Sequence, residues 1–215
     1  MYKRQGITYT NFLYVQLINN FIHDIVKEAA NIVVTGISSS FVIMAQAIEP
    51  DNFKKIILVN PSDINIIREM PTKETNAAKT ILEIPIIGTF IYNLIMHHKR
   101  IRNYIESKYF FKKTFLSSKL EDTYFESAHK GNSAGKYLLA STKGNYVNID
   151  ITNAVKKADK LYIISSRERN NAVAITEKYL HLNKNIEATY ISNSRYLPQL
   201  ETPDKFKDIV LMFLQ

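Results

Sequence analysis

The sequence of 215 residues contains no cysteine, and it has only six glycines and six prolines. Without cysteine the chain has no disulfide, no cysteine nucleophile and no thiolate metal site. The low glycine and proline content, together with 46% hydrophobic residues, excludes a disordered chain and a fibrous repeat. The length instead predicts one large domain, or a domain with an insertion, that buries a substantial core.

The sequence also lacks the patterns that mark metal and nucleic-acid sites. No spacing of histidines and carboxylates resembles a metal-binding motif, and we expect neither a metal nor a cofactor. The formal net charge is +8, but the lysines are spread along the chain and the only dense basic cluster runs from His97 to Arg102. No helix-turn-helix or RNA-binding signature accompanies this cluster, so nucleic acid is not an expected partner.

Long hydrophobic segments are missing as well. No apolar segment typical of a signal peptide follows the N-terminus, and we expect a soluble, cytoplasmic protein. The most apolar window, Ile81 to Met96, is interrupted by Glu83 and Asn93, and it is too short to span a bilayer. We interpret it as an apolar helix in a lid over a pocket, with contact to a membrane surface as the alternative.

The first five residues, MYKRQ, resemble the translation of a sequencing adapter. This resemblance predicts that the true reading frame begins upstream and that these residues are not part of the natural protein.

Short apolar runs alternate with helical patterns near both ends of the chain. The predicted strands are 32–35, 56–61, 160–165 and 186–192, and the predicted helices are 11–29, 172–182 and 203–214. The first strand is expected to be buried on both faces, because it is short, apolar and β-branched. Since strands that alternate with helices pair in parallel, the sequence predicts an α/β protein with a parallel sheet of about four strands flanked by helices.

The middle of the chain follows a different pattern. No parallel-strand pattern occurs there, whereas helical patterns recur around 73–83, 90–107 and 122–139. We therefore predict a helical insertion. The predicted organisation is an N-terminal part of the core at 6–61, the insertion at 62–150 and a C-terminal part of the core at 151–215.

A serine-rich turn, GISSS from Gly36 to Ser40, follows the first predicted strand. In a nucleophile elbow of the form G-x-S-x-G, such a turn raises the serine hydroxyl above the end of the sheet, and the next N–H faces the developing oxyanion. Ser40 replaces the second glycine of that motif. The turn therefore indicates either a nucleophile, Ser38, or serines that cap the following helix.

Three stretches resemble members of the α/β-hydrolase superfamily: TGISSSFVIMA, KKIILVNPSD and YLPQLETPDKFKDIVLMFL. The resemblance covers almost the whole chain after residue 6. In detail, the sequence is similar to a cap-bearing subgroup from Firmicutes. The resemblance implies a partial α/β-hydrolase fold in which 62–150 is the cap. It also implies N-terminal truncation, because the family's earlier strand and its oxyanion loop have no counterpart before residue 11. The strand at 32–35 is then expected to have an unpaired edge.

The resemblance assigns roles to individual residues. Ser38 matches the nucleophile, and the N–H of Ser39 matches one oxyanion donor. Glu168, in SSRER, matches the triad acid, and Asp63 is the alternative acid. Both carboxylates have the alternative interpretation of solvated loop charges.

The triad base is where the sequence departs from the family. Family members place a histidine before LPxLExP, and this chain has Tyr196 there, whose ordinary pKa of about 10 makes it a poor base at neutral pH. Of the five histidines, His129 in the cap is the one expected to reach the pocket as a substitute base. A structural or surface role for His129 is the alternative.

These features predict a serine hydrolase acting on an ester, thioester or amide bond, incomplete in this chain. The alternative is a catalytically silent hydrolase-fold protein that binds a ligand or a protein. Ser38 favours the enzyme and Tyr196 favours the binding protein, and the fold alone decides neither. Aromatic and aliphatic residues of the cap suggest a small acyl substrate or an apolar ligand. A binder of anionic surfaces through Lys99 to Arg102 would show an affinity that falls steeply with salt. No sequence feature indicates an oligomeric state.

Overall fold

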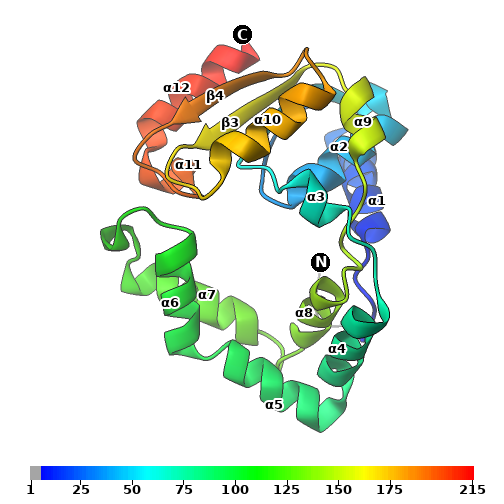
Figure 1. Cartoon of the computed structure of the whole chain (residues 1–215), viewed down its shortest axis with the longest axis vertical. Coiled ribbons are helices and arrows are strands. Elements are labelled where there is room, and N and C mark those ends of the chain that lie inside the picture. The colour runs from blue at the N-terminus through cyan, green and yellow to red at the C-terminus, as the bar shows by residue number, and fades with distance from the viewer. Residues whose placement is uncertain (1–5) are drawn as a thin grey trace. The chain divides into compact units, whose positions relative to one another are not determined.

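The computed structural model describes residues 6–215, so MYKRQ, to which the adapter interpretation applies, lies outside the described residues. The described chain divides into two compact units (Figure 1). Residues 12–69 and 149–215 form an α/β unit, and residues 6–11 and 70–148 form a helical unit.

The α/β unit contains a four-stranded parallel sheet in the order β1-β2-β3-β4. The strands are β1 (Ala30–Thr35), β2 (Phe53–Val59), β3 (Leu161–Ser166) and β4 (Glu187–Ile191). In the register of the sheet, Val34 lies opposite Leu58, and Leu58 lies opposite Ile163. The predicted α/β class, the four strands and their parallel pairing are confirmed.

The helices of this unit include the predicted ones, one of them shortened, and three short helices that were not predicted. They are α1 (Asn11–Phe21), α2 (Ser38–Ile48), α3 (Ile64–Ile67), α9 (Thr152–Lys157), α10 (Ala172–Leu182), α11 (Pro198–Glu201) and α12 (Pro203–Leu214). The three short helices that were not predicted are α3, α9 and α11. The predicted first helix, 11–29, ends early, because α1 passes into a π-helical turn at Ile22–Val26 and the chain then turns through Lys27, whose φ is 61°. Both α10 and α12 begin and end at the predicted residues.

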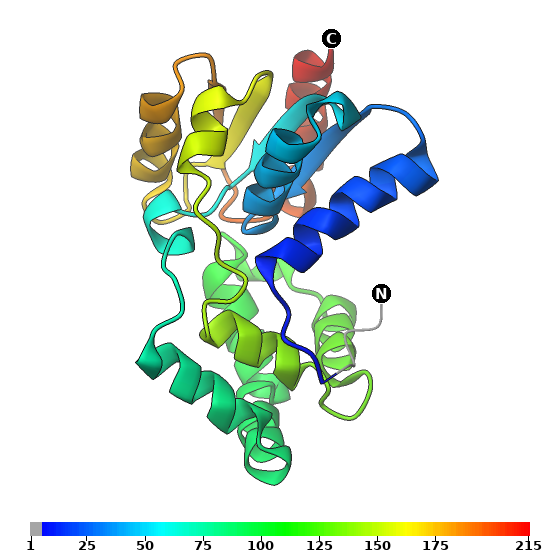
Figure 2. The same ribbon diagram turned by 90° about the vertical axis from the view of Figure 1, so that its right-hand side faces the viewer.

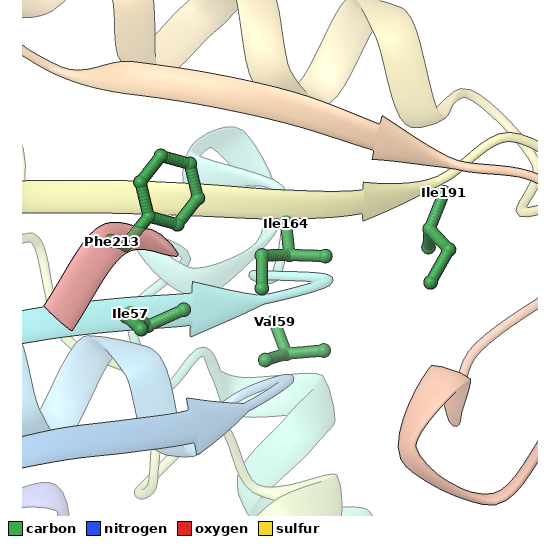
Figure 3. Close-up of a cluster of buried hydrophobic side chains, with 5 residues drawn as sticks. All are labelled: Ile57, Val59, Ile164, Ile191 and Phe213. Carbon is green, nitrogen blue, oxygen red and sulfur yellow. The ribbon is translucent and has the colours of Figure 1, made fainter. Parts of the chain in front are cut away.

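The central strands β2 and β3 are buried on both faces. Residues 56–59 and 163–164 are fully buried, which is why these strands read as continuous apolar runs rather than alternating ones. On one face, Ile57, Val59, Ile164 and Ile191 pack in a cluster with Phe213 of α12 (Figure 3). Helices α2, α9 and α10 lie on the other face (Figure 1).

Strand β1 differs from the central strands. No residue of β1 is fully buried, and Val33 is 46% exposed. Among the described residues β1 pairs with β2 alone, so the expected unpaired edge is confirmed. The prediction that this strand is buried on both faces is wrong, because an edge strand packs against fewer neighbours.

The helical unit confirms the predicted helical insertion. Its helices are α4 (Lys73–Glu83), α5 (Pro85–Ile95), α6 (His98–Lys108), α7 (Ser118–His129) and α8 (Lys136–Lys143). The predicted helices 90–107 and 122–139 are each divided in two. The second division has a clear cause, because Gly131, Asn132 and Ser133 all have positive φ, a conformation that cannot continue a right-handed helix.

Helices α4 and α5 meet at a sharp bend of 97° (Figure 2). Pro85 opens α5, and the residue before it, Ile84, is extended with ψ 127°, as the ring of a following proline requires. A Cβ added to Gly88 would lie 1.9 Å from the Leu82 carbonyl oxygen, so only glycine permits this close approach of the two helices. No single helix of the described residues is long and apolar enough to cross a membrane, and α4 with α5 meets that test only as a bent pair.

The boundaries of the helical unit differ from the predicted insertion, 62–150. The unit begins at Met70 and ends at Asn148. Residues just after 62 belong to the α/β unit, where the Tyr179 hydroxyl donates to the Ser62 carbonyl oxygen at 2.9 Å. The segment 6–11 joins the helical unit instead, and the N–H of Tyr9 donates to the Ser141 hydroxyl at 2.9 Å.

Candidate functional site

The candidate site lies at the carboxyl ends of the parallel strands of the α/β unit, the edge at which open α/β sheets bind ligands. Strand β1 ends at Thr35, the chain turns at Gly36 with φ 65°, and α2 begins at Ser38. The Ser38 residue is partly exposed. Ser38 therefore occupies the strand–turn–helix position expected of it, and its reactivity stays a prediction.

The backbone of this turn uses the N–H that was predicted to hold an oxyanion. The Ser39 N–H donates to the Gly36 carbonyl oxygen at 3.1 Å, so in this conformation it is engaged within the turn, and its role as an oxyanion donor stays a prediction. The capping alternative is wrong, because Ile37 is the N-cap of α2 and no side chain caps this helix. The Ser40 hydroxyl donates back to the Ile37 carbonyl oxygen at 2.7 Å.

Tyr196 packs directly against the turn. A Cβ built on Gly36 would lie 2.0 Å from the Tyr196 hydroxyl oxygen and 3.1 Å from its Cζ. The Tyr196 phenol therefore lies so close to the Gly36 backbone that any residue with a Cβ atom at position 36 would clash with it. The residue aligned with the family's histidine lies beside Gly36, and it presents a phenol where an imidazole would be expected.

Glu168 holds the loop that carries Tyr196. Its two carboxylate oxygens accept hydrogen bonds from the backbone N–H groups of Asn193, at 3.0 Å, and Ser194, at 3.2 Å. Such charge-assisted bonds to backbone donors are strong. The role of Glu168 as a triad acid stays a prediction, and its observed partners fix the loop after β4.

A buried polar network connects the ends of β2, β3 and β4. Asn60, which has φ 48°, donates from Nδ2 to the Ser166 hydroxyl at 2.9 Å and to the Tyr196 carbonyl oxygen at 3.0 Å, and its Oδ1 accepts from the Ser166 N–H at 2.8 Å. The Ser166 and Ser194 hydroxyls are 3.0 Å apart, and the Ser194 hydroxyl donates to Glu201 at 3.1 Å. The sequence analysis missed this network, although an asparagine directly after a buried strand, in LVNP, was a signal for it.

Arg169 brings a positive charge to the same edge. One of its N–H groups donates to the Pro61 carbonyl oxygen at 2.9 Å, and its guanidinium carbon lies 5.5 Å from the centroid of the Tyr196 ring. Burial lowers the pKa of this guanidinium, which nevertheless stays charged at neutral pH. Among the described residues no carboxylate oxygen lies within 4.0 Å of its nitrogens. The sequence analysis also missed Arg169, which stands next to Glu168 in SSRER.

The alternative acid, Asp63, is engaged by a neighbouring cation. Its two oxygens lie 2.8 Å and 2.7 Å from the Lys178 Nζ, and it accepts a further bond from the Asn65 N–H at 2.9 Å. Partial burial opposes ionisation of this carboxyl, but the hydrogen bonds from Lys178 and Asn65 outweigh burial and hold its pKa below the ordinary value. Asp63 therefore has the partners of a structural ion pair.

This ion pair predicts a pH-dependent stability. We expect Lys178→Met to lower the free energy of unfolding by about 1 kcal/mol at neutral pH, because the pair is only partly screened by solvent. A lowered pKa in the folded state contributes stability above the unfolded pKa of about 4, and that contribution is lost as the pH falls through the folded value. Urea denaturation at several pH values should show the difference near neutrality and its disappearance in acid. An equal difference at all pH values, or an equal loss in the exposed control Lys184→Met, would contradict it.

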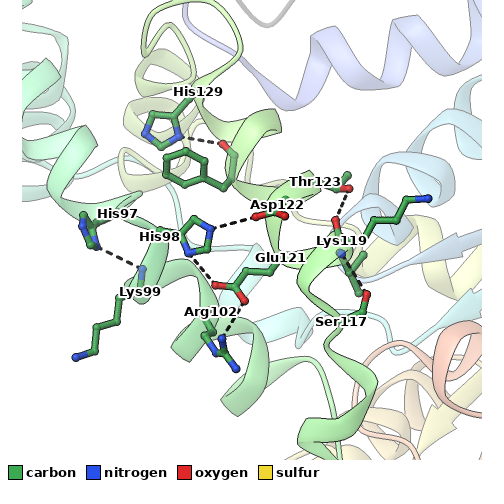
Figure 4. Close-up of polar contacts among 12 residues, drawn as sticks. His97, His98, Lys99, Arg102, Ser117, Lys119, Glu121, Asp122, Thr123 and His129 are labelled. Atoms are coloured by element: carbon green, nitrogen blue, oxygen red, sulfur yellow. Dashed lines mark hydrogen bonds and ion pairs between the residues drawn. The ribbon is translucent and has the colours of Figure 1, made fainter.

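The proposed substitute base, His129, belongs to the helical unit. Its Nδ1 lies 2.9 Å from the Phe125 carbonyl oxygen, and its ring is tilted by 30° against the Phe125 ring, with centroids 4.2 Å apart. Nearby, Nδ1 of His98 lies 2.8 Å from a carboxylate oxygen of Glu121, which also pairs with Arg102 (Figure 4). The contacts of His98 and Arg102 with Glu121 join α6 to α7. A role of His129 as a base stays a prediction.

The two histidines of the α/β unit lie away from the carboxyl edge. His23 is exposed, precedes β1 and pairs with Asp24 at 2.7 Å. His181 lies near the end of α10, which returns the chain to the amino end of the sheet before β4. In the part of the chain that the structure describes, no group of three or more histidine, aspartate or glutamate side chains could hold a metal ion.

Searches of protein-family models and of curated proteins gave no match to this chain. Solved structures match over almost its whole length. An α/β hydrolase enzyme from a Medee basin deep-sea metagenome library is 16% identical with a TM-score of 0.65, and the match covers 97% of this chain and 73% of that one.

Two further structures extend the likeness. A carboxylesterase structure from the thaumarchaeon Nitrososphaera gargenis is 15% identical with a TM-score of 0.66. The meta-cleavage product hydrolase CumD of Pseudomonas fluorescens, as a mutant complexed with acetates, is 13% identical with a TM-score of 0.73. Both matches cover 98% of this chain and 73% of the other. At these identities the likeness shows the fold alone, and with the parallel sheet and the helical insertion it establishes that this chain has the α/β-hydrolase fold.

Proposed function

We propose that this chain binds a small organic acid at the carboxyl edge of its sheet, beside Ser38, and that binding rather than acyl transfer is its activity. The observation that carries this proposal is Arg169, whose guanidinium lies next to Tyr196 with no carboxylate within 4.0 Å among the described residues. A partly buried cation is costly unless an anion or hydrogen-bond acceptors compensate its charge. Burial lowers the pKa of Arg169, and the Asp63 carboxylate opposes this effect only from beyond 4.0 Å.

A carboxylate is the anion that best fits this cation. Guanidinium groups bind carboxylates through two parallel N–H···O bonds. One N–H of Arg169 already donates to the Pro61 carbonyl oxygen, and this bond limits the orientations that the guanidinium can take. The aromatic ring of Tyr196 offers an apolar surface beside the charge. The fold neighbour CumD was solved with acetates, which supports a carboxylate ligand for this chain.

The geometry of the turn favours binding over turnover. The Ser39 N–H is bonded to Gly36, and the loss of one oxyanion donor lowers the rate of acyl transfer by about 10² to 10³ in well-studied enzymes. Tyr196 stands where a histidine would accept the Ser38 proton, and the loss of a triad member lowers the rate further.

The role of Arg169 predicts a selective loss of affinity. We expect hexanoate, measured by isothermal titration calorimetry, to bind Arg169→Met about 10- to 100-fold more weakly than the original chain, because a charge-assisted hydrogen bond is lost. The matched control is Arg167→Met in the same loop, since Arg167 is exposed and its guanidinium lies 5.8 Å from the centroid of the Tyr190 ring. Equal affinities for the two variants would rule out Arg169 as the carboxylate-binding residue.

A second candidate function is serine hydrolysis of an ester, thioester or amide bond, with Ser38 as the nucleophile. The observation that favours it is the partly exposed Ser38, which opens α2 directly after the turn that follows β1, together with a fold shared with carboxylesterases and serine hydrolases. In that function Glu168 would be the acid, and the role of His129 as the base stays a prediction. It requires the Ser39 N–H to leave Gly36 during the reaction.

A further inference from the structure

The helical unit exposes a group of large apolar side chains along the end of α4 and the length of α5. They are Ile81, Ile84, Ile86, Ile87, Phe90 and Leu94, and we refer to them as the α5 ridge. Ile86 is 83% exposed and Phe90 65% exposed. Single exposed apolar residues are ordinary, whereas a group of them on one helix marks an interaction site.

The ridge is a consequence of how α5 packs. Successive residues of a helix are about 100° apart, which places residues 86, 87, 90 and 94 on one side of α5 and Gly88 and Tyr92 on the opposite side. Gly88 and Tyr92 are buried, and the Tyr92 hydroxyl donates to the Ala128 carbonyl oxygen at 2.7 Å. The amine of Lys136 donates to the Pro85 carbonyl oxygen at 3.2 Å. These contacts fix the helix with its apolar side facing outward.

The positive charge of the protein is concentrated in the same unit. Residues 70–148 contain 12 lysines and arginines against six acidic residues, whereas residues 12–69 and 149–215 together contain 14 of each. Helix α5 has no charged residue, and the first turn of the next helix, α6, carries the exposed cations Lys99 and Arg100. Among the described residues neither cation has a carboxylate within 4.0 Å, and the Lys99 side chain points away from the His98 and Glu121 contacts (Figure 4).

We infer that the α5 ridge docks on the surface of an anionic lipid bilayer. An apolar helix face next to basic residues is the composition of helices that lie in the membrane interface, where apolar side chains enter the acyl boundary and cations meet anionic headgroups. The 11 residues of α5 make a helix about 16 Å long, roughly half of the hydrocarbon thickness.

The charge of the unit favours a lipid surface over a second copy of the chain. In a two-fold dimer formed through the ridge, the same patch of both copies would meet. Both copies would then bring a helical unit with 12 basic against six acidic residues to the interface, and units of like net charge repel. An anionic bilayer offers the complementary charge to Lys99 and Arg100 at once. The ridge uses neither Ser38 nor Arg169, so this inference is independent of the proposed function.

Co-sedimentation of the full chain with vesicles tests the inference. We expect binding to phosphatidylcholine vesicles that contain phosphatidylserine, weaker binding to pure phosphatidylcholine, and loss of affinity as salt is raised. Ile86→Ser with Phe90→Ser should lower the affinity by at least about tenfold, because two large apolar side chains no longer leave water. Lys99→Gln with Arg100→Gln should lower it about tenfold on phosphatidylserine vesicles only, since each cation contributes through the anionic surface.

The matched control is Val173→Ser with Met212→Ser, two apolar residues of the α/β unit that are 54% and 58% exposed. This variant should bind vesicles as the original chain does, and circular dichroism with thermal unfolding should show that all variants are folded. The inference is overturned if the original chain does not bind phosphatidylserine vesicles, if the ridge variant binds them as tightly, or if the control loses as much affinity. A ridge-dependent dimer in analytical ultracentrifugation without vesicle binding would show that a second copy covers the ridge.

Discussion

Replacing Gly36 by alanine is expected to lower the free energy of unfolding by about 3 kcal/mol. The backbone at Gly36 has φ 65°, and a left-handed conformation costs a residue with a side chain about 1 to 2 kcal/mol. The new Cβ would also lie 2.0 Å from the Tyr196 hydroxyl oxygen, and overpacking of a close contact costs about 1 to 3 kcal/mol. Urea denaturation of the purified variant measures the total.

A double substitution separates these two causes. In a Tyr196→Phe background the hydroxyl is absent and the nearest atom to the new Cβ is Cζ, at 3.1 Å. Gly36→Ala should then cost about 2 kcal/mol, most of it the backbone contribution, because Cζ has to shift by only a few tenths of an ångström. The control Gly6→Ala should be almost neutral, because its Cβ would meet no atom closer than 3.6 Å. An unchanged cost of Gly36→Ala in the Tyr196→Phe background would contradict the packing of Tyr196 on the turn.

Asn60→Ala is expected to have the largest effect on stability, a loss of about 4 kcal/mol. Its side chain makes three hydrogen bonds to Ser166 and Tyr196, and the site is fully buried. Alanine would leave the Ser166 N–H and the Tyr196 carbonyl without this partner, and an unsatisfied buried polar group costs about 1 to 3 kcal/mol. The left-handed backbone at this position, φ 48°, adds about 1 kcal/mol for alanine.

The exposed residue Asn132 provides the matched control for Asn60. Its φ is 53°, close to that of Asn60, and it lies at the surface. Asn132→Ala should therefore report the backbone contribution alone, about 1 kcal/mol or less. If the two substitutions lowered the free energy of unfolding equally in urea, the buried network around Asn60 would contribute nothing, contrary to the structure.

Local patterns were sufficient to predict most of the α/β unit. The runs at 56–61 and 160–165 correspond to β2 and β3 because strands covered on both faces must be apolar throughout, and α10 and α12 match their predicted bounds. The helical unit was predicted less well. The basic residues 97–100 between the two apolar stretches are themselves compatible with a helix, so periodicity did not reveal that α5 ends at Ile95 and that His97 caps α6.

The candidate site could be predicted only in part. The order of strand, turn and helix located Ser38, and the segment YLPQLE located Tyr196. The hydrogen bonds of Asn60 join residues 106 and 136 positions apart, and no local pattern reports such contacts. The same limit applies to Arg169, whose partners Pro61 and Tyr196 come from the ends of two other strands.

The most direct test of the proposed function is calorimetric titration of the full chain with hexanoate and with methyl hexanoate, followed by analysis of each mixture for released methanol. We predict that the acid binds, that the ester binds at least about tenfold more weakly because it has no charge to meet Arg169, and that no methanol is released. Equal binding of acid and ester, or release of methanol that is lost in Ser38→Ala, would contradict the binding proposal, and the second result would support a serine hydrolase.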